Sequence, residues 1–481
     1  MKKSTWKKQH KWWGLVLTFF LLMFCVSGLV LNHPALFSSV NVSRGMLPGS
    51  YEYRQWNNGL MRGTVKWQGQ VLMYGNGGVW ITNDTGAAFA DFNTGLPEGN
   101  DARNIRRMVV MPSRLLFALG PYGVYRFRMG TGWEELPLER AGGERLSDMA
   151  SQGDTLVVTG RSRVYLSQPP YDRFTALELQ SPDDFDGKVS LFRTVWLLHS
   201  GELFGLVGQL IVDGIALVLI FLCLSGLLYW FMPRASKQVH TLLMRKLFAW
   251  HNSVGRITIL FTLFVCITGW FLRPPALIAI ARAKVPPLPF SAMDSPNPWN
   301  DKLRTLRYDE ACQDWLLYTS EGFYSLHRLD SRPRKVSVQP PVSVMGLNVE
   351  EKDLSGNWLL GSFSGMYVWN RQTGMVADYF TSLPPVQTRG IPIGAHAVSG
   401  YSADFAVPGF VVDYYAGTDA VKMPEWMASL PMSLRALCLE IHTGRIYTFL
   451  GMGTVFYIFV IGLAILWCLW SGWKISVRRK K

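Results

Sequence analysis

Four long apolar runs dominate the sequence, near residues 12–32, 203–231, 255–273 and 447–470. Each run has about the 20 residues that an α-helix needs to cross a bilayer. One such run could be a buried core helix of a soluble protein, but four of them flanked by aromatic residues favour a multi-pass membrane protein. The first run is too long for the h-region of a signal peptide and has no small-x-small cleavage motif, so we interpret it as a retained anchor.

The first and third runs are copies of one another. His10 and Gly14 open the first run, and His251 and Gly255 open the third with the same spacing. Three further pairs align without a gap: Cys25 with Cys266, Ser27 with Thr268, and Gly28 with Gly269. A match in fixed register indicates an internal repeat.

The second and fourth runs carry a second matched pair of histidines. His199-Ser-Gly precedes the second run, and His442-Thr-Gly precedes the fourth. Two glycine pairs follow at equal spacing: Gly205 with Gly451, and Gly226 with Gly472. The chain is therefore expected to contain two copies of a helix, a large segment and a second helix.

Lysine and arginine cluster at both ends of the chain and between the second and third runs, in residues 2–11, 234–246 and 474–481. Cytoplasmic loops carry an excess of these residues, so all three clusters are expected on the cytoplasmic side. The net charge of +14 reflects these clusters in part and gives no indication of nucleic-acid binding.

The expected fold is an α-helical four-span bundle built from two repeats, with a β-rich domain outside the membrane. The expected divisions are 1–33 (N-terminus and first span), 34–198 (outer segment), 199–232 (second span), 233–250 (cytoplasmic loop), 251–275 (third span), 276–440 (outer segment), 441–473 (fourth span) and 474–481 (basic tail).

Both outer segments repeat one short phrase of an apolar strand, a glycine turn and an aromatic strand. It occurs at Val71–Ile81, Leu115–Phe127 and Trp358–Trp369, with weaker copies from Leu156 and Trp315. Strand hairpins at a period of about 40 residues predict propeller-like blades, assembled into one periplasmic domain from both segments. Two separate small β domains are the alternative. The six cysteines lie mostly in or beside the spans, so we expect packing roles and no disulfide framework.

The matched histidines predict two metal centres. A histidine is costly in a membrane unless it binds something, and cofactor ligands in four-helix bundles come from facing helices. His10 with His251 at the inner level, and His199 with His442 at the outer level, are expected as axial ligands of two non-covalent b haems. Glycines beside them would leave room for a flat macrocycle. Zinc usually takes three or four ligands, often thiolates, and C-x-x-C-H for covalent haem is absent.

The other histidines have weaker claims. His33 ends the first span at its outer edge and could replace one of the outer ligands. His240 is expected to be solvated, and His327 and His396 belong to the outer domain. Arg445 and Arg273 at the outer edge, and Arg256 at the inner edge, could meet haem propionates or extend to headgroups. Asp213 lies within the second span and is a candidate for coupled protonation.

These motifs resemble the PepSY-associated transmembrane family of bacterial inner-membrane proteins. The shared elements are H-x-x-x-G opening the first and third spans, the later [ST]-G, and H-[ST]-G before the second and fourth spans. The resemblance implies a bacterial inner-membrane protein, an association with iron acquisition, and similarity to haem-containing reductases of ferric siderophores. Together with the basic clusters, it predicts a multi-pass protein with both termini in the cytoplasm. The outer segments depart from the family, because they show blade-like repeats instead of a PepSY α+β unit.

The expected function is electron transfer across the membrane through two b haems, by an oxidoreductase that acts on a periplasmic ferric chelate. The donor would be a quinol or a cytoplasmic molecule, since the chain has no dinucleotide-binding fingerprint. Membrane lipid is the remaining expected partner. The alternative is a membrane-anchored periplasmic propeller that binds or senses a ligand without redox activity. A transporter is a weaker alternative, because four spans without a broken-helix pair are atypical.

Overall fold

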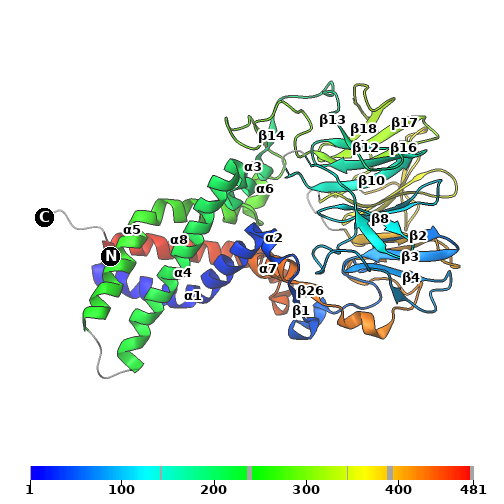
Figure 1. Cartoon of the computed structure of the whole chain (residues 1–481). Helices are drawn as coiled ribbons and strands as arrows, with labels where there is room; N and C mark the ends of the chain where they lie inside the picture. The colour runs from blue at the N-terminus through cyan, green and yellow to red at the C-terminus, as the bar shows by residue number, and fades with distance from the viewer. Residues whose placement is uncertain (1, 141–142, 236–240, 344, 387–393, 477–481) are drawn as a thin grey trace. The chain divides into compact units, whose positions relative to one another are not determined.

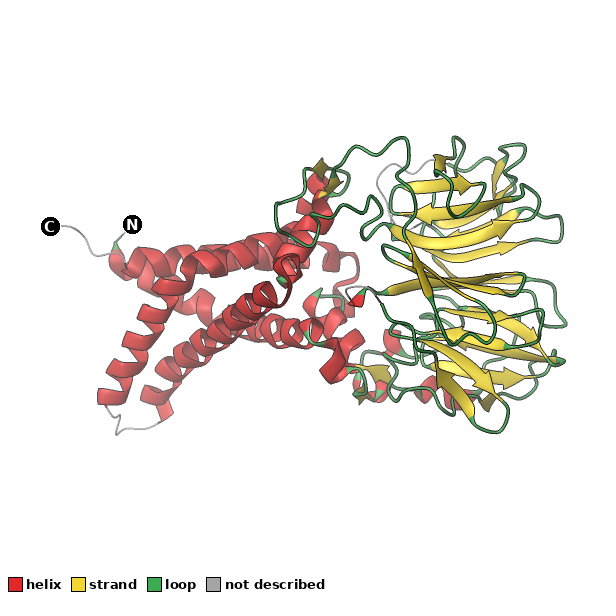
Figure 2. Ribbon diagram, turned by 45° about the horizontal axis from the view of Figure 1, so that its top comes forward, coloured by secondary structure: helices red, strands yellow, loops and turns green. Residues whose placement is uncertain are grey.

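The structure is a computed structural model that describes residues 2–140, 143–235, 241–343, 345–386 and 394–476. His240 and the end of the basic tail therefore lie outside the described residues. The chain divides into two compact units. The first comprises Met1–Phe37, Gly187–Ser295 and Leu434–Lys481, and the second comprises Ser38–Asp186 and Pro296–Ser433. Helices dominate the first unit and strands the second (Figure 2).

Four long helices form the first unit: α1 (Lys3–Asn32), α4 (Gly205–Ala235), α5 (Thr241–Phe271) and α8 (Thr454–Ser476) (Figure 1). In the described part of the chain, these four regions are long and apolar enough to cross a membrane, which is compatible with a multi-pass membrane protein. Each helix packs against two neighbours, in the order α1, α4, α5, α8 and back to α1. Helices α1 and α5 therefore face each other across the bundle.

Short elements connect the long helices to the rest of the chain. They are α2 (Pro34–Phe37), α3 (Leu191–Ser200), η4 (Glu202–Phe204), α6 (Ala276–Ile280), α7 (Leu434–His442), η6 (Thr448–Gly453) and the paired strands β14 (Val189–Ser190) and β15 (Lys284–Val285). Helices α3 and α7 are separate from the long helices that follow them. The expected divisions 199–232 and 441–473 include these breaks.

Glycines cause the two breaks. Gly201 follows α3 with φ 82°, and Gly444 follows α7 with φ 75°. Backbone in this left-handed region terminates helices and is accessible to glycine at little cost. His199 and His442 consequently lie in the last turns of short helices and not at the start of the long ones.

The second unit contains, among its described residues, five antiparallel sheets of four strands each. They are β2–β5 (Gly63–Trp67, Gln70–Gly75, Gly78–Thr82, Ala90–Asp91), β6–β9 (Arg107–Val110, Leu116–Leu119, Val124–Arg128, Gly132–Glu135), β10–β13 (Leu146–Gln152, Thr155–Gly160, Val164–Ser167, Thr175–Leu177), β16–β19 (Leu303–Asp309, Asp314–Thr319, Gly322–Leu326, Arg334–Lys335) and β20–β23 (Leu347–Lys352, Trp358–Ser362, Gly365–Trp369, Val376–Asp378). The strands of every sheet pair in chain order, as in a meander.

Smaller elements complete this unit: the strand pairs β24–β25 (Val398–Ser402, Phe410–Asp413) and β1–β26 (Asn41–Val42, Met432–Ser433), and the 3₁₀ turns η1 (Arg44–Met46), η2 (Gly49–Tyr51) and η5 (Glu425–Ser429). The repeated phrases of the sequence form the two middle strands of the five sheets. The second unit lies within the expected segments 34–198 and 276–440, and α2, α3, α6 and α7 belong to the helical unit.

Each sheet shares an apolar core with the next sheet along the chain. Pairs of residues in the same cores are Tyr74 with Leu116, Phe117 with Leu156, Val157 with Trp315, Phe323 with Trp369, and Met366 with Val398. A further core joins Trp80 of the first sheet to Val412 of β25. The core containing Val157 and Trp315 therefore combines side chains from both segments of the unit.

Candidate functional site

The histidines that open the first and third apolar runs meet across the helical bundle. His10 lies on α1 and His251 on α5, and their ring centroids are 6.2 Å apart with the planes at 72°. Both rings are half-buried. The structure thus brings together two side chains that the sequence separates by the length of a whole repeat.

A second pair has similar geometry. His199 on α3 and His442 on α7 have ring centroids 6.0 Å apart and planes at 55°. Helix α3 packs against α5, and α7 packs against α1. Because His442 contacts Gly28 near the end of α1, whereas His10 lies near its start, the two pairs are separated by about 27 Å along the helix.

Every one of the four rings has hydrogen-bonding groups at Nδ1: a backbone carbonyl and the hydroxyl of a serine or threonine. The distances are 3.1 Å from His10 to Cys468 O and 3.2 Å to Ser471 Oγ, 3.1 Å from His199 to Val265 O and 3.3 Å to Thr268 Oγ1, 3.1 Å from His442 to Phe24 O and 3.0 Å to Ser27 Oγ, and 3.0 Å from His251 to Ser225 Oγ. The Leu222 carbonyl completes the set at His251.

This bonding determines the tautomer of the rings. A carbonyl oxygen can accept a hydrogen bond but cannot donate one. Nδ1 of each ring therefore carries the proton, and Nε2 keeps its lone pair. Among the described residues, no hydrogen-bond partner contacts Nε2 of any of the four rings. Hydrogen bonds of this kind at the second ring nitrogen are typical of metal-binding histidines.

Each histidine is held by the opposite repeat. His10 belongs to the first copy and is held by Ser471 of the second, whereas His251 belongs to the second copy and is held by Ser225 of the first. The same exchange relates the other pair, in which Thr268 holds His199 and Ser27 holds His442. Neither pair can therefore form from one repeat alone.

A glycine follows each of these hydroxyl residues and lies against a ring edge. A Cβ atom would lie 2.6 Å from His199 Cε1 at Gly269, 3.0 Å from His10 Cε1 at Gly472, 3.3 Å from His442 Cε1 at Gly28, and 3.4 Å from His251 Cε1 at Gly226. These glycines make room for imidazole edges, whereas the sequence suggested room for a macrocycle.

The sequence analysis missed half of this arrangement. It aligned Ser27 with Thr268 as part of the repeat, but did not assign them to a histidine, and it overlooked Ser225 and Ser471. The sequence could have indicated both overlooked serines, because each directly precedes a glycine of the matched pair Gly226 and Gly472.

His33 does not join either pair. Its Nε2 lies 2.8 Å from Oδ2 of Asp213, the carboxylate within α4. Arg445 forms an ion pair with Glu440, and its Nε lies 2.9 Å from the Glu440 carboxylate. Arg273 is near enough to this pair for electrostatic repulsion from Arg445 and attraction to Glu440.

Arg256 lies apart from this group, on the wall of a cavity of about 490 Å³. Its lining residues are Asn252, Ser253, Arg256 and Ile257, all on α5. A cationic and two neutral polar side chains of α5 therefore border this space.

Two further histidines, His327 and His396, belong to the second unit and contact no other histidine ring in the described structure. The ring of His396 packs against Phe380 with centroids 4.1 Å apart and planes at 31°, and His327 is exposed. The six cysteines are free, as expected from their positions in the sequence.

Buried charges occur in the first strands of the sheets. Arg307 pairs with Asp148, and Arg107 pairs with Glu351. Glu350 is buried nearby, and neither of its carboxylate oxygens has a hydrogen-bond partner in the described part of the chain. Burial raises the pKa of Glu350 to about 7, although Arg307 acts in the opposite direction.

A group of potential metal ligands in this unit is already neutralised. Asp309, Cys312 and Asp314 have ligand atoms within 4.8 Å of one another. However, Arg371 pairs with both carboxylates, and Lys352 lies 2.7 Å from Asp309. Burial alone would raise the pKa of Asp309, but hydrogen bonds from Lys352, Trp358 and Arg371 hold that pKa well below its usual range. These contacts indicate a structural ion-pair network.

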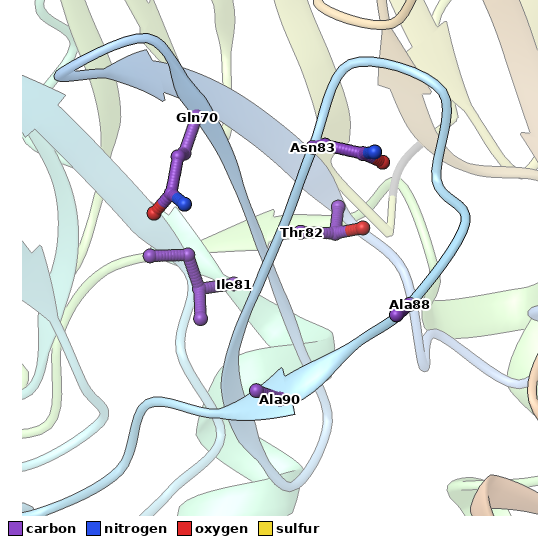
Figure 3. Close-up of a pocket in the computed structure, with 6 residues that line it drawn as sticks. All are labelled: Gln70, Ile81, Thr82, Asn83, Ala88 and Ala90. Atoms are coloured by element: carbon purple, nitrogen blue, oxygen red, sulfur yellow. The ribbon is translucent and has the colours of Figure 1, made fainter.

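The second unit also has a small surface pocket of about 250 Å³ beside its first sheet (Figure 3). Its lining residues are Gln70, Ile81, Thr82, Asn83, Ala88 and Ala90. The Thr82 hydroxyl is buried and has no hydrogen-bond partner among the described residues.

Comparison with solved structures finds partial similarities at low identity. The extracellular domain described as part of the one-component system BT4673 of B. thetaiotaomicron matches with a TM-score of 0.34 and 11% identity, over 76% of this chain and 38% of that one. The extracellular domain of the hybrid two-component system BT3049 from the same organism matches with a TM-score of 0.34 and 9% identity, over 76% of this chain and 40% of that one. PorZ, a surface component of the type-IX secretion system of Porphyromonas gingivalis, matches with a TM-score of 0.30 and 10% identity, over 76% of this chain and 38% of that one.

The chain spans about two fifths of the length of these solved structures, and similarities at this level carry no functional information. No curated protein matches the sequence. A family model does match, over residues 1–232 and again over 233–479. These two matches correspond to the two repeats, each of which supplies the hydroxyl groups that contact the histidines of the other. The chain belongs to the family of the PepSY-associated TM region.

Proposed function

We propose that the protein is a transmembrane electron conduit that holds a b-type haem at each histidine pair. The observation that carries this proposal is the spacing of the rings, 6.2 Å in one pair and 6.0 Å in the other. A metal–imidazole bond measures about 2.0–2.1 Å, so two rings on opposite sides of one metal need centres roughly 6 Å apart. The lone pair at Nε2 of each ring is the atom that would form this bond.

The type of donor favours haem over other metals. Each pair supplies two neutral nitrogens, and the described residues form no group of three potential ligands at either pair. The Cys468 thiol lies 3.6 Å from His10, but at Nδ1 and not at Nε2. Zinc sites usually need three or four ligands, whereas low-spin haem takes one axial imidazole on each face. When bound, haem supplies one-electron transfer between ferric and ferrous iron.

The residues of the chain have distinct tasks in this proposal. The four histidines would hold the iron, and the carbonyl and hydroxyl groups at Nδ1 would keep each ring oriented and raise its basicity. Apolar residues such as Cys25, Ile215 and Leu219 fill the bundle between the two levels and exclude water. Arg256 and Arg445 are the candidates for contact with the propionates at the two levels.

Sidedness follows from the basic clusters, which assign the His10–His251 pair to the cytoplasmic level. Electrons would then enter at this level from a quinol or a cytoplasmic donor, and leave at the His199–His442 pair for a periplasmic ferric chelate. The association with iron acquisition that the family resemblance implies supports such an acceptor, and bacterial inner-membrane localisation is part of the same proposal.

We also propose that the second unit is a β-propeller of six blades, with β24–β25 as the smallest. The meander order within each sheet supports this arrangement. So does the series of shared cores, because it returns from β25 to the first sheet. The first strands of neighbouring sheets also contact one another, for example β2 with β6, β6 with β10, and β2 with β24.

Optical spectroscopy of the purified full-length protein tests the conduit. We expect the dithionite-reduced protein to show the absorption bands of b-type haem, and the reduced haem to be reoxidised on mixing with a ferric chelate. His442→Ala should prevent chelate reduction while the other haem remains reducible. Protein without such bands would refute the conduit. Haem that stays reduced with several chelates would refute the choice of acceptor.

A binding or sensing role is the second candidate, favoured by the pocket in Figure 3. The unpartnered Thr82 hydroxyl, together with the amides of Gln70 and Asn83, would suit a small uncharged polar ligand. If the protein lacks haem, soaking or calorimetry with such ligands, with Thr82→Val as control, would test this role.

A further inference from the structure

One polar group in the helical unit has no counterpart in the other repeat. Asp213 of α4 accepts a hydrogen bond from Asn32 at 3.1 Å and contacts His33 at 2.8 Å. The Asp213 side chain is 11% exposed, and that of His33 is 35% exposed. An ionisable residue within a membrane span is costly and usually functional.

The repeat provides an internal control for this group. The spacing that aligns His10 with His251 places Arg273 and Pro274 opposite Asn32 and His33, and the spacing that aligns the glycines places Phe459 opposite Asp213. The second copy fills the position with an aromatic stack, in which Phe459 and Trp270 have centroids 5.1 Å apart. The bundle therefore does not need a carboxylate at this position in order to fold.

The group is connected to the His199–His442 pair by hydrogen bonds. Asn32 Nδ2 donates to Asp213 and also to the carbonyl of Ser200, at 3.1 Å in both cases. Ser200 directly follows His199 in the last turn of α3. Asn32 thereby links the Asp213 carboxylate to the backbone next to His199, so a change of charge at Asp213 is coupled over a short distance to the His199–His442 pair.

Other charged groups near Asp213 are few. The elements packed against α4 are α1, α3, α5 and η4. His33 directly follows α1, and the lysines of α1 lie near its start, at Lys3, Lys7, Lys8 and Lys11. Helix α3 carries His199 and Arg193, and η4 carries Glu202. The cations of α5 lie toward its start, at the far end of the α4–α5 hairpin, and Arg273 follows its end. In the described part of the chain, His33 is the only basic side chain within ion-pair distance of Asp213.

We propose that His33 and Asp213 form a proton-exchange site for the His199–His442 pair, an inference that rests on the proposed electron conduit. Asp213 orients the imidazole through Nε2, and Nδ1 of His33 is the atom that exchanges the proton. For each electron that arrives at the His199–His442 pair, one proton binds to His33. When the electron leaves to the ferric acceptor, the proton is released, so charge and atoms balance.

The test is a redox titration of the full-length protein at several pH values, with each haem followed by its absorption. In the wild type we expect the midpoint potential of the haem at His199–His442, assigned by its loss in His442→Ala, to fall with rising pH. One proton per electron corresponds to about 59 mV for a tenfold change in proton concentration. Asp213→Asn should abolish this slope, and Asp213→Glu should restore most of it.

Trp270→Phe is the matched control, because it removes the indole hydrogen bond to the Phe459 carbonyl at the corresponding position of the second repeat. It should leave the slope unchanged. If Asp213→Asn does not fold, His33→Gln makes the same prediction with a neutral polar side chain.

The outcomes separate the two proposals. A wild-type protein without reducible haem overturns both. Reducible haem with potentials that do not depend on pH overturns proton exchange and leaves the conduit intact. A slope that persists in both Asp213→Asn and His33→Gln also overturns proton exchange. Loss of the slope in these variants, with retained haem and a normal Trp270→Phe control, supports it.

Discussion

His10 and His251 are 6.2 Å apart between ring centroids, on helices that face each other across the bundle. Neither ring is oriented by its own repeat. Ser471 holds the first, and Ser225 holds the second. This exchange means that the geometry of each pair depends on both copies, and it leads to predictions that separate ligands from the residues that position them.

Replacing one ligand should affect one level only. In His251→Ala we expect the haem at His10–His251 to be lost and the other to be retained, because about 27 Å separates the two levels. Haem per chain, measured by absorption of the pyridine complex, should fall by half. His327→Ala, in the second unit, is the control and should retain both haems. Loss of both haems from a folded His251→Ala protein would contradict independent sites.

The loss of haem caused by replacing a glycine with alanine should be larger where the new Cβ would lie closer to a histidine ring. At Gly269 a Cβ would lie 2.6 Å from the His199 ring, whereas at Gly226 it would lie 3.4 Å from the His251 ring. Gly269→Ala should therefore displace its histidine and lower haem retention more than Gly226→Ala. Gly214→Ala has open space around the new methyl group and should be neutral, or stabilise α4 by up to ~1 kcal/mol. Equal losses in all three variants would argue against this role of the glycines.

The hydroxyl groups at Nδ1 should influence the affinity and midpoint potential of the haem without being required for haem binding. Ser225→Ala removes the 3.0 Å contact with Nδ1 of His251 but leaves the Leu222 carbonyl. We expect haem to remain bound with an altered midpoint potential and an affinity weakened by roughly 10–100-fold. Thr258→Ala is the control, because the Thr258 hydroxyl donates to Val254 on the same helix. An unchanged potential in Ser225→Ala would show that this hydroxyl has no influence on the metal.

Glu350 should make the stability of the second unit depend on pH. Burial raises its pKa from 4.5 to about 7, so the folded unit favours the protonated carboxyl. The resulting stabilisation is complete below pH 4.5 and is lost as pH rises through about 7; a shift of this size corresponds to roughly 3 kcal/mol at most. Glu350→Gln should reduce this dependence, measured as the urea midpoint by tryptophan fluorescence at pH 5 and pH 8. Glu98→Gln, at an exposed position, should retain it.

The two segments of the second unit should fold only together. Val157 and Val164 share a core with Trp299 and Leu303, which lie in the other segment. Expression of 34–198 alone would expose this apolar surface, so we expect aggregation or the absence of a cooperative melt. Co-expression with 276–440 should improve solubility. A monomeric, cooperatively melting fragment 34–198 would disprove the shared core.

The sequence alone determined the parts of the structure that depend on local pattern. Hydropathy over about 20 residues is enough to identify a span, and equal spacing is enough to identify the repeat and to match His10 with His251. The repeated strand phrases likewise predicted hairpins, since alternating apolar residues around a glycine turn specify one locally.

The tertiary structure decided which residues meet. His10 and its partner Ser471 are 461 positions apart, so their contact depends on the packing of α1 against α8 and on no local preference. The pairing of His33 with Asp213 has the same origin, and the sequence left His33 as a possible ligand for that reason. Left-handed backbone at Gly201 and Gly444 placed two histidines on separate short helices, because a glycine can continue a helix or end it and only the surrounding contacts select between the two.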